Sequence, residues 1–453
     1  MKPLLTIAML VVPLLPDSGD DISVPYTQFK LDNGLNVIIH EDHTTPLVSV
    51  NIWYHVGSAR EEPGRTGFAH LFEHIMFEGS AHVPEGMFDI WLEGAGGVSN
   101  GSTTEDRTNY WENLPSNALE MALFLESDRM GFLLEVVSPE QVDGQRDVVK
   151  NERRQSYENR PYGSVWEKFP GLMYPPDHPY SWPVIGSMAD LSAASHADVT
   201  NFFKRYYGPN NASLSIAGDV DVEEVRRLVN KWFGEIPSGP KLPELNVPMP
   251  ILSEEKRLVL EDKVQLPRLY MAWHTPGYFK AGDAEMDILA SILADGKNSR
   301  LYKRLVFDMQ IAQDVNAFQA SQKMSSAFII IATARGGHTL SELEAVIQEE
   351  IDKLVSDAPT DRELARAVNQ FEAQFLRRLE RPGSFGGKAD LLNSYYFYTG
   401  DPGYFAKDLE RYKRMIPAEV SASAKQYLKR DARVIISVVP EGKPELAAKE
   451  VSP

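Results

Sequence analysis

Two histidines and a glutamate within about one helical turn form the clearest chemical pattern in this sequence. They lie in the segment TGFAHLFEHIMF (residues 66–77), where His70, Glu73 and His74 interrupt an apolar run. On an α-helix His70 and His74 project about 40° apart, and Glu73 lies about 60° to the other side of His70. Two imidazoles at this spacing can bind one Zn²⁺, and a carboxylate on the same face can reach a water on the metal.

Two surface histidines spaced by chance are the alternative interpretation. The apolar neighbours of this pattern argue against it, because a buried helix does not carry two histidines and a glutamate on one stripe without a partner for them. We therefore expect a metal site on this helix.

A zinc site with catalytic function needs a third protein ligand and an open position for water. The chain has no cysteine, so the ligand must be a histidine or an acid, and none of the other eight histidines stands out. A helix predicted over residues 139–157, which opens with a capping box at Ser138 and Gln141, offers acids instead. Its candidates are Glu140, Asp143, Asp147 and Glu152, and spacing alone does not choose among them.

The composition limits the function further. The 453 residues carry 46 basic and 64 acidic side chains, a formal charge of −18, with 43% hydrophobic and 24% charged residues. This balance is ordinary for a globular protein of two or three domains. It argues against nucleic-acid binding, which relies on clustered basic residues.

The N-terminus predicts export. Lys2 precedes the apolar run Leu4–Leu15, which is too short for a membrane span and suits the core of a signal peptide. We expect residues 1–19 to be a signal peptide and the protein to reach a bacterial periplasm, although Pro16–Gly19 does not match the usual cleavage pattern. A buried strand or short anchor is the alternative. No other apolar run reaches eighteen residues, so we expect no stable membrane span.

The rest of the chain predicts two copies of one structural unit. Strands, a helix, further helices and a closing strand occur in that order in residues 24–236 and again in 253–445, with a proline-rich linker at 237–252. We expect an α+β protein of two similar α/β units, each a mostly antiparallel sheet packed against helices.

Several motifs carry a resemblance to a known family. They are Gly67–Phe77, Gly96–Thr103, Arg146–Arg153, Glu158–Gly163, Tyr206–Asp219 and Ser299–Tyr302. Through them the chain resembles the pitrilysin family of inverted zinc metallopeptidases, which carry the order H-x-x-E-H and include insulysin and mitochondrial processing peptidase. The resemblance covers nearly the whole chain after the leader.

The resemblance implies a role for each matching residue. His70, His74 and Glu152 would be the ligands of one Zn²⁺ per chain, and Glu73 the general base that takes a proton from water and returns it to the leaving amine. Residues 97–103 would form an edge strand that pairs with the substrate backbone. Gly97, Ser99 and Asn100 are the substrate-binding candidates there, and a turn-forming role beside Gly101 is the alternative for Asn100.

The resemblance further implies a zinc-dependent endopeptidase that cleaves oligopeptides or unfolded segments in a chamber formed by two chains. A non-catalytic or partner-dependent structural subunit of a peptidase-like complex is the alternative. Whether the substrate is general or one dedicated target stays open.

The chain departs from the family pattern at two places. Gln145 stands where many active relatives have a second acid, and we expect it to tune the zinc site. The Arg/Tyr pair that relatives place against the substrate is not identifiable in Ser325–Ile331, and the second-half segment Ala284–Leu289 has no histidine. A homodimer or a heterodimer with a zinc-less subunit bearing the Arg/Tyr pair is therefore expected, and the missing pair favours the heterodimer.

Overall fold

The structure, a computed structural model, describes residues 22–449. The signal peptide predicted for residues 1–19 lies outside the described residues. Within the described part of the chain, no helix is long and apolar enough to cross a membrane.

The first unit is built on a six-stranded sheet with the order β1-β2-β6-β3-β5-β4. Neighbouring strands are antiparallel except for the parallel pair β2 and β6. The strands are β1 (Thr27–Lys30), β2 (Asn36–Glu41), β3 (Leu47–Tyr54), β4 (Val98–Thr103), β5 (Thr108–Pro115) and β6 (Ala212–Gly218). The helices are α1 (Phe68–Ile75), α2 (Met87–Gly94), α3 (Leu119–Phe132), α4 (Pro139–Arg153), α5 (Ser164–Met173), α6 (Met188–Ala193), α7 (His196–Tyr206) and α8 (Val222–Phe233).

The second unit has a five-stranded sheet with the order β7-β11-β8-β10-β9, in which only β7 and β11 are parallel. The strands are β7 (Lys256–Asp262), β8 (Arg268–Pro276), β9 (Ala312–Ala320), β10 (Ser325–Ala334) and β11 (Val434–Pro440). The helices are α9 (Asp283–Ala294), α10 (Leu340–Ser356), α11 (Asp361–Leu379), α12 (Lys388–Thr399), α13 (Phe405–Lys413) and α14 (Pro417–Tyr427).

The two sheets repeat one topology. The order β2-β6-β3-β5-β4 corresponds strand by strand to β7-β11-β8-β10-β9, and β1 is an addition to the first unit. Consequently α1 and α9 occupy equivalent places, and each follows a glycine in the left-handed region, Gly67 (φ 90°) or Gly282 (φ 97°). The predicted fold class, α+β with two similar and mostly antiparallel units, is confirmed.

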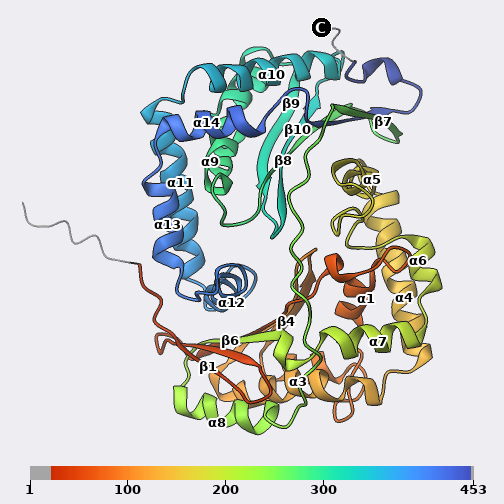
Figure 1. Cartoon of the computed structure of the whole chain (residues 1–453), viewed down its shortest axis with the longest axis vertical. Coiled ribbons are helices and arrows are strands. Elements are labelled where there is room, and N and C mark those ends of the chain that lie inside the picture. Colours follow the sequence, from red (N-terminus) through yellow and green to blue (C-terminus); the bar gives the residue numbers. More distant parts are fainter. Residues whose placement is uncertain (1–21, 450–453) are drawn as a thin grey trace, which may run out of the picture.

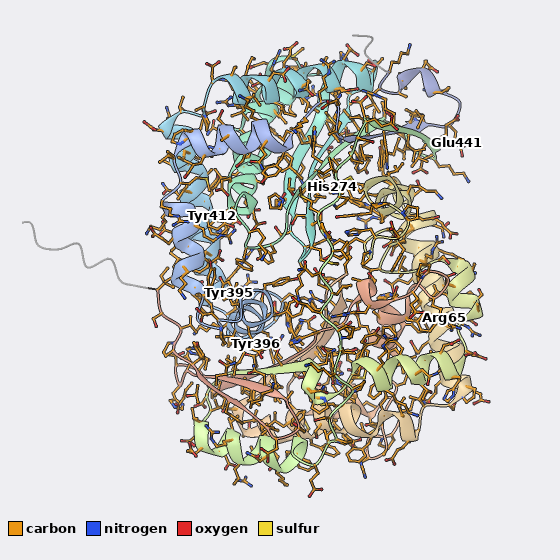
Figure 2. All side chains as sticks on the ribbon, in the orientation of Figure 1. Arg65, His274, Tyr395, Tyr396, Tyr412 and Glu441 are labelled. Carbon is orange, nitrogen blue, oxygen red and sulfur yellow. The ribbon has the colours of Figure 1, made fainter. Side chains whose placement is uncertain are left out.

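Each sheet packs against its own helices on one face and against a helix of the other unit on the opposite face. Helix α12 of the second unit lies on β2, β3 and β6, and α5 of the first unit lies against the second sheet (Figure 1). His274 on β8 donates from Nε2 to the Met173 carbonyl of α5 at 2.7 Å. Tyr395 and Tyr396 belong to α12, which lies between the two units (Figure 2). The extended segment 237–252 runs from one unit to the other (Figure 1).

Candidate metal centre

Helix α1 turns its chemical residues away from the core. Phe68, Leu71, Phe72 and Ile75 are buried against the first sheet and the neighbouring helices. Because apolar residues at this spacing fix one face of the helix inward, His70, Glu73 and His74 share the other side.

The start of α1 is fixed by a residue that the sequence did not single out. The two carboxylate oxygens of Glu61 accept hydrogen bonds from the backbone N–H groups of Gly67 and Ala69, at 2.9 and 2.8 Å. Burial raises the pKa of Glu61 to about 8, against the opposing effect of these hydrogen bonds. Gly67 is required here, because a side chain at its positive φ would also lie 2.8 Å from the Ile185 carbonyl. No local pattern reveals Glu61, because its partners are reached only when the chain folds back.

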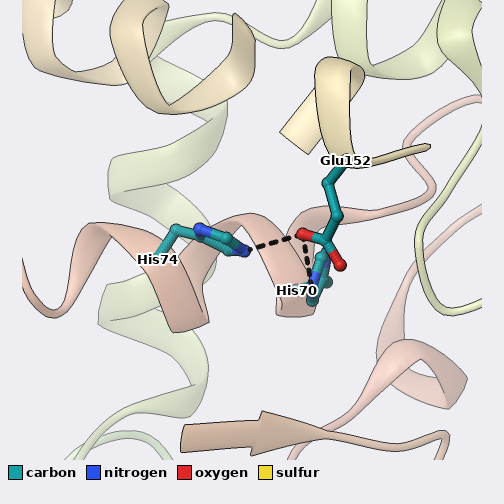
Figure 3. A group of neighbouring side chains, drawn as sticks. All are labelled: His70, His74 and Glu152. Atoms are coloured by element: carbon teal, nitrogen blue, oxygen red, sulfur yellow. Dashed lines mark ion pairs between the residues drawn. The ribbon is translucent and has the colours of Figure 1, made fainter. Parts of the chain in front are cut away.

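The structure brings His70, His74 and Glu152 together (Figure 3). A Glu152 carboxylate oxygen lies 3.7 Å from His70 Nε2 and 3.3 Å from His74 Nε2. Ligands about 2.1 Å from a tetrahedral zinc lie about 3.4 Å from each other, so these separations fit a zinc ion. In the described part of the chain, these three side chains are the one group of at least three His, Cys, Asp or Glu residues placed to hold a metal.

Helix α4 positions Glu152. It begins with the predicted capping box, in which Gln141 N donates to Ser138 Oγ at 3.2 Å, and it packs on α1 through its buried face. After Glu152 the backbone passes into a π-helical turn (Arg154–Glu158), and Arg153 forms ion pairs with Glu158 at 2.5 Å and Glu167 at 2.9 Å. These pairs hold the end of α4 against α5.

The other acids of α4 lie apart from the histidines. Asp143 and Asp147 pair with basic residues on their own helix, and Glu140 lies in the first turn. Geometry therefore distinguishes Glu152 from the three candidates that spacing left open.

Glu73 lies between α1 and the edge strand β4. Thr103 Oγ1 donates to Glu73 Oε2 at 2.6 Å, and a Cβ on Gly101 would lie 3.2 Å from Glu73 Cγ. Burial raises the pKa of Glu73, while the hydrogen bond from Thr103 opposes that rise. Thr103 belongs to a motif that the sequence indicated, but its contact with Glu73 needed the structure.

Burial favours the neutral form of His70. Burial is the main cause that lowers the pKa of His70 to about 4, and the neighbouring His74 lowers it further. The contact with His74 lowers the pKa of Glu152, so a carboxylate faces the two imidazoles. These are the protonation states in which such side chains bind metal.

Strand β4 has an open edge beside this group. The N–H of Thr104 donates to the Arg107 carbonyl and closes the β4–β5 hairpin. In an antiparallel pair, every second residue directs its N–H and C=O toward the partner strand. The backbone groups of Ser99, Gly101 and Thr103 therefore point away from β5, toward the open edge. The Gly101 N–H accordingly bonds Asn100 Oδ1 at 2.8 Å rather than β5.

The three substrate-binding candidates differ in their surroundings. Gly97 is buried and its N–H donates to the Leu92 carbonyl at 2.8 Å, and Ser99 Oγ lies 3.4 Å from Asp89. Asn100 is exposed on the strand face opposite Thr103. Ser99 and Asn100 thus lie on the open strand, whereas Gly97 shapes its beginning.

Family models match both units. The model of the insulinase family, peptidase family M16, matches residues 36–169, and the model described as the peptidase M16 inactive domain matches residues 193–371. The chain is also 30% identical over 370 residues to the zinc protease PqqE of Helicobacter pylori, covering 80% of this chain and 82% of that protein. The chain belongs to the insulinase (M16) family.

Solved structures of similar proteins share this fold. A protease from Helicobacter pylori superposes with a TM-score of 0.87 at 26% identity, covering 92% of this chain and all of that one. The periplasmic protease PqqL from Escherichia coli superposes with a TM-score of 0.77 at 18% identity, and the match spans 95% of this M16 chain but 50% of PqqL.

Gln145 bonds an acid instead of a histidine. Its Nε2 donates to Glu78 Oε1 at 2.5 Å, and burial, together with Glu85, raises the pKa of Glu78. Glu78 follows His74 by four residues, so the amide–carboxylate pair lies just beyond the end of α1. The effect of Gln145 on the metal stays a prediction.

Proposed function

We propose that this chain is a zinc-dependent endopeptidase that cleaves oligopeptides or unfolded segments. One observation carries the proposal: two imidazole nitrogens and a carboxylate oxygen converge at zinc-like separations, and the half-buried Glu73 lies on the same helical turn beside an open edge strand. A structural subunit has no need of all four side chains in this arrangement.

In the proposed mechanism His70, His74 and Glu152 hold the zinc. When bound, the zinc would acidify a water on its open position and polarise the peptide carbonyl. Glu73 would take a proton from the attacking water as the water oxygen adds to the carbonyl carbon, and would return it to the amine nitrogen as the C–N bond breaks. Thr103 orients the Glu73 carboxylate through the 2.6 Å hydrogen bond.

The substrate backbone would add to β4 as a further strand. The outward N–H and C=O groups of Ser99 and Gly101 would supply pairing that does not depend on substrate sequence. In the free protein the Gly101 N–H donates to Asn100 Oδ1. For the Gly101 N–H to pair with the substrate, the Asn100 side chain must turn away, and it is then free to contact the substrate. Gly97 would hold the start of the strand.

Each chain would supply one metal centre to a two-chain enclosure. Helix α9 stands where α1 stands in the first unit but has no histidine, and PqqL is about twice as long as the matched region. We propose a heterodimer with a zinc-less subunit that supplies the Arg/Tyr pair, with a homodimer as the alternative.

The apolar leader supports export to the periplasm. The proposed domains are residues 24–236 and residues 253–445, joined by the linker 237–252.

The test is cleavage of a mixed oligopeptide pool by the purified chain, with its metal content measured, with and without a chelator. Chelator-sensitive cleavage restored by zinc would support a self-sufficient peptidase, and hence a homodimer. One zinc per chain without cleavage would support dependence on a partner subunit. Cleavage that a chelator leaves unchanged would contradict the proposal.

A further inference from the structure

A loop of the second unit crosses the face of the first sheet that its own helices leave uncovered. This loop, residues 381–387 (RPGSFGG), connects α11 to α12. A Cβ on Gly383 would lie 1.9 Å from the Asn113 side-chain amide and 2.1 Å from Ser49 Oγ, so the backbone lies directly on β3 and β5. Ser384 Oγ is 2.7 Å from the Asn113 amide.

Further contacts hold the loop in one conformation. Gly386 N donates to Asp390 at 2.8 Å, and Asp390 also accepts from Trp53 Nε1 on β3 at 2.9 Å. Ser384 has φ 67°, a conformation that non-glycine residues adopt rarely and that surrounding contacts must impose.

The loop nevertheless leaves a large aromatic side chain in solvent. Phe385 is 43% exposed, whereas its neighbour Trp111 on β5 is only 8% exposed. The two rings meet edge to face, with centroids 5.6 Å apart. Anchoring by Gly383, Ser384 and Gly386 does not need an exposed phenylalanine, so packing of the loop leaves Phe385 unexplained.

The strand register places Phe385 beside the path of a bound peptide. Trp111 pairs with Asn100 of β4, and side chains alternate between faces, so Val98, Asn100 and Ser102 share the face on which Phe385 lies. Val98 is 55% exposed and continues the apolar surface. A peptide on the open edge of β4 would direct every second side chain to this face.

We propose that Phe385, with Val98, forms a side-chain subsite that selects a large apolar residue on alternate positions of the bound peptide. The inference rests on the proposed addition of the substrate to β4. Neighbouring strands are about 4.8 Å apart, so a phenylalanine or leucine can reach across Asn100 to the ring, whereas an alanine cannot. The second unit thereby contributes selectivity to the metal centre of the first.

The test measures binding, so that it does not depend on turnover. Zinc-loaded Glu73→Gln protein is titrated into fluorescent host peptides in which one position at a time is Phe or Ala. We expect Phe to bind about tenfold more tightly than Ala at positions two residues apart. Adding Phe385→Ala should reduce this preference to about twofold or less, while Phe385→Leu should keep most of it.

Phe307→Ala is the matched control, because Phe307 is another exposed aromatic residue of the second unit and is 71% exposed. It should leave the preference unchanged, and circular dichroism should show that all variants are folded. A preference that survives Phe385→Ala, or that lacks the two-residue period, would overturn the inference while leaving the peptidase proposal intact. Phe385-dependent binding without any cleavage by the unsubstituted protein, even with the partners that co-purify, would support the subsite and contradict the peptidase. Failure to bind any peptide would contradict both.

Discussion

The side chains proposed as zinc ligands are held in place by contacts that lie away from their ligand atoms. The buried face of α1 fixes His70 and His74, and the ion pairs of Arg153 fix the turn that carries Glu152. Because these supports do not involve the ligand atoms, a single ligand can be changed without removing the scaffold that presents it.

Glu152→Gln should lower zinc affinity by at least about a hundredfold, because an amide oxygen is a weaker ligand than a carboxylate and carries no charge. Metal content after dialysis against a zinc buffer measures the effect. The matched control is Asp147→Asn on the same helix, where Asp147 contacts Lys150 at 3.2 Å. Unchanged zinc in Glu152→Gln would assign the third ligand elsewhere.

Thr103→Val should reduce kcat about tenfold with KM and zinc content unchanged, because it removes the hydrogen bond that orients Glu73. Thr103→Ser retains the hydroxyl and should restore most of the activity. Steady-state kinetics on one peptide, with metal analysis of each variant, separates this positioning role from a structural one. A loss of zinc in Thr103→Val would contradict it.

At the scale of elements, the sequence predicted what periodicity and capping encode. The helix that carries His70, the capping box at Ser138 and the repeated strand order all follow local patterns, and the structure has them. Contacts between distant segments were beyond it. Asp390 accepts a hydrogen bond from Trp53 across 337 residues of sequence. Glu61 is only six to eight residues from its partners, but it caps α1 through a turn of the chain that no capping pattern predicted. The exchange of α5 and α12 between the sheets therefore needed the structure.

Gly383→Ala should destabilise the docking of the second unit on the first sheet by about 1–3 kcal/mol, because the added methyl group has no room beside Asn113 and Ser49. Thermal unfolding and limited proteolysis before α12 measure the effect. Gly144→Ala in α4 is the control, since nothing lies within 4 Å of the added Cβ and alanine favours helix. Equal stability of the two variants would contradict the close packing.

Acid should weaken the attachment of α11 to the segment after α9. Arg300, at 2.6 and 2.9 Å, and the Thr360 N–H bind Glu363 and lower its pKa from 4.5 to about 2. The folded state favours ionised Glu363, so this stabilisation is present above about pH 4.5 and is lost as the pH falls toward 2. The difference in Tm between unsubstituted protein and Glu363→Gln should therefore shrink between about pH 6 and pH 3. A difference independent of pH would contradict the ion pair.

At the scale of the whole molecule, residues 22–449 contain one candidate metal group, in the first unit, and none in the second unit. If a zinc-less subunit completes the site, the isolated chain should show no measurable cleavage, and adding that subunit should produce cleavage without changing the zinc bound per chain. Light scattering after size exclusion gives the assembly, and activity across a titration of the subunit gives the dependence. Full activity in a stable homodimer would contradict the heterodimer.

The central claim is that Glu73 acts on a zinc held by His70, His74 and Glu152. The most direct measurement compares unsubstituted and Glu73→Gln protein, each with the partners that co-purify, for zinc content and peptide turnover in the same preparation. We predict about one zinc per chain in both and turnover reduced by several orders of magnitude in Glu73→Gln. Turnover at the unsubstituted rate in Glu73→Gln, or zinc absent from both proteins, would contradict the account.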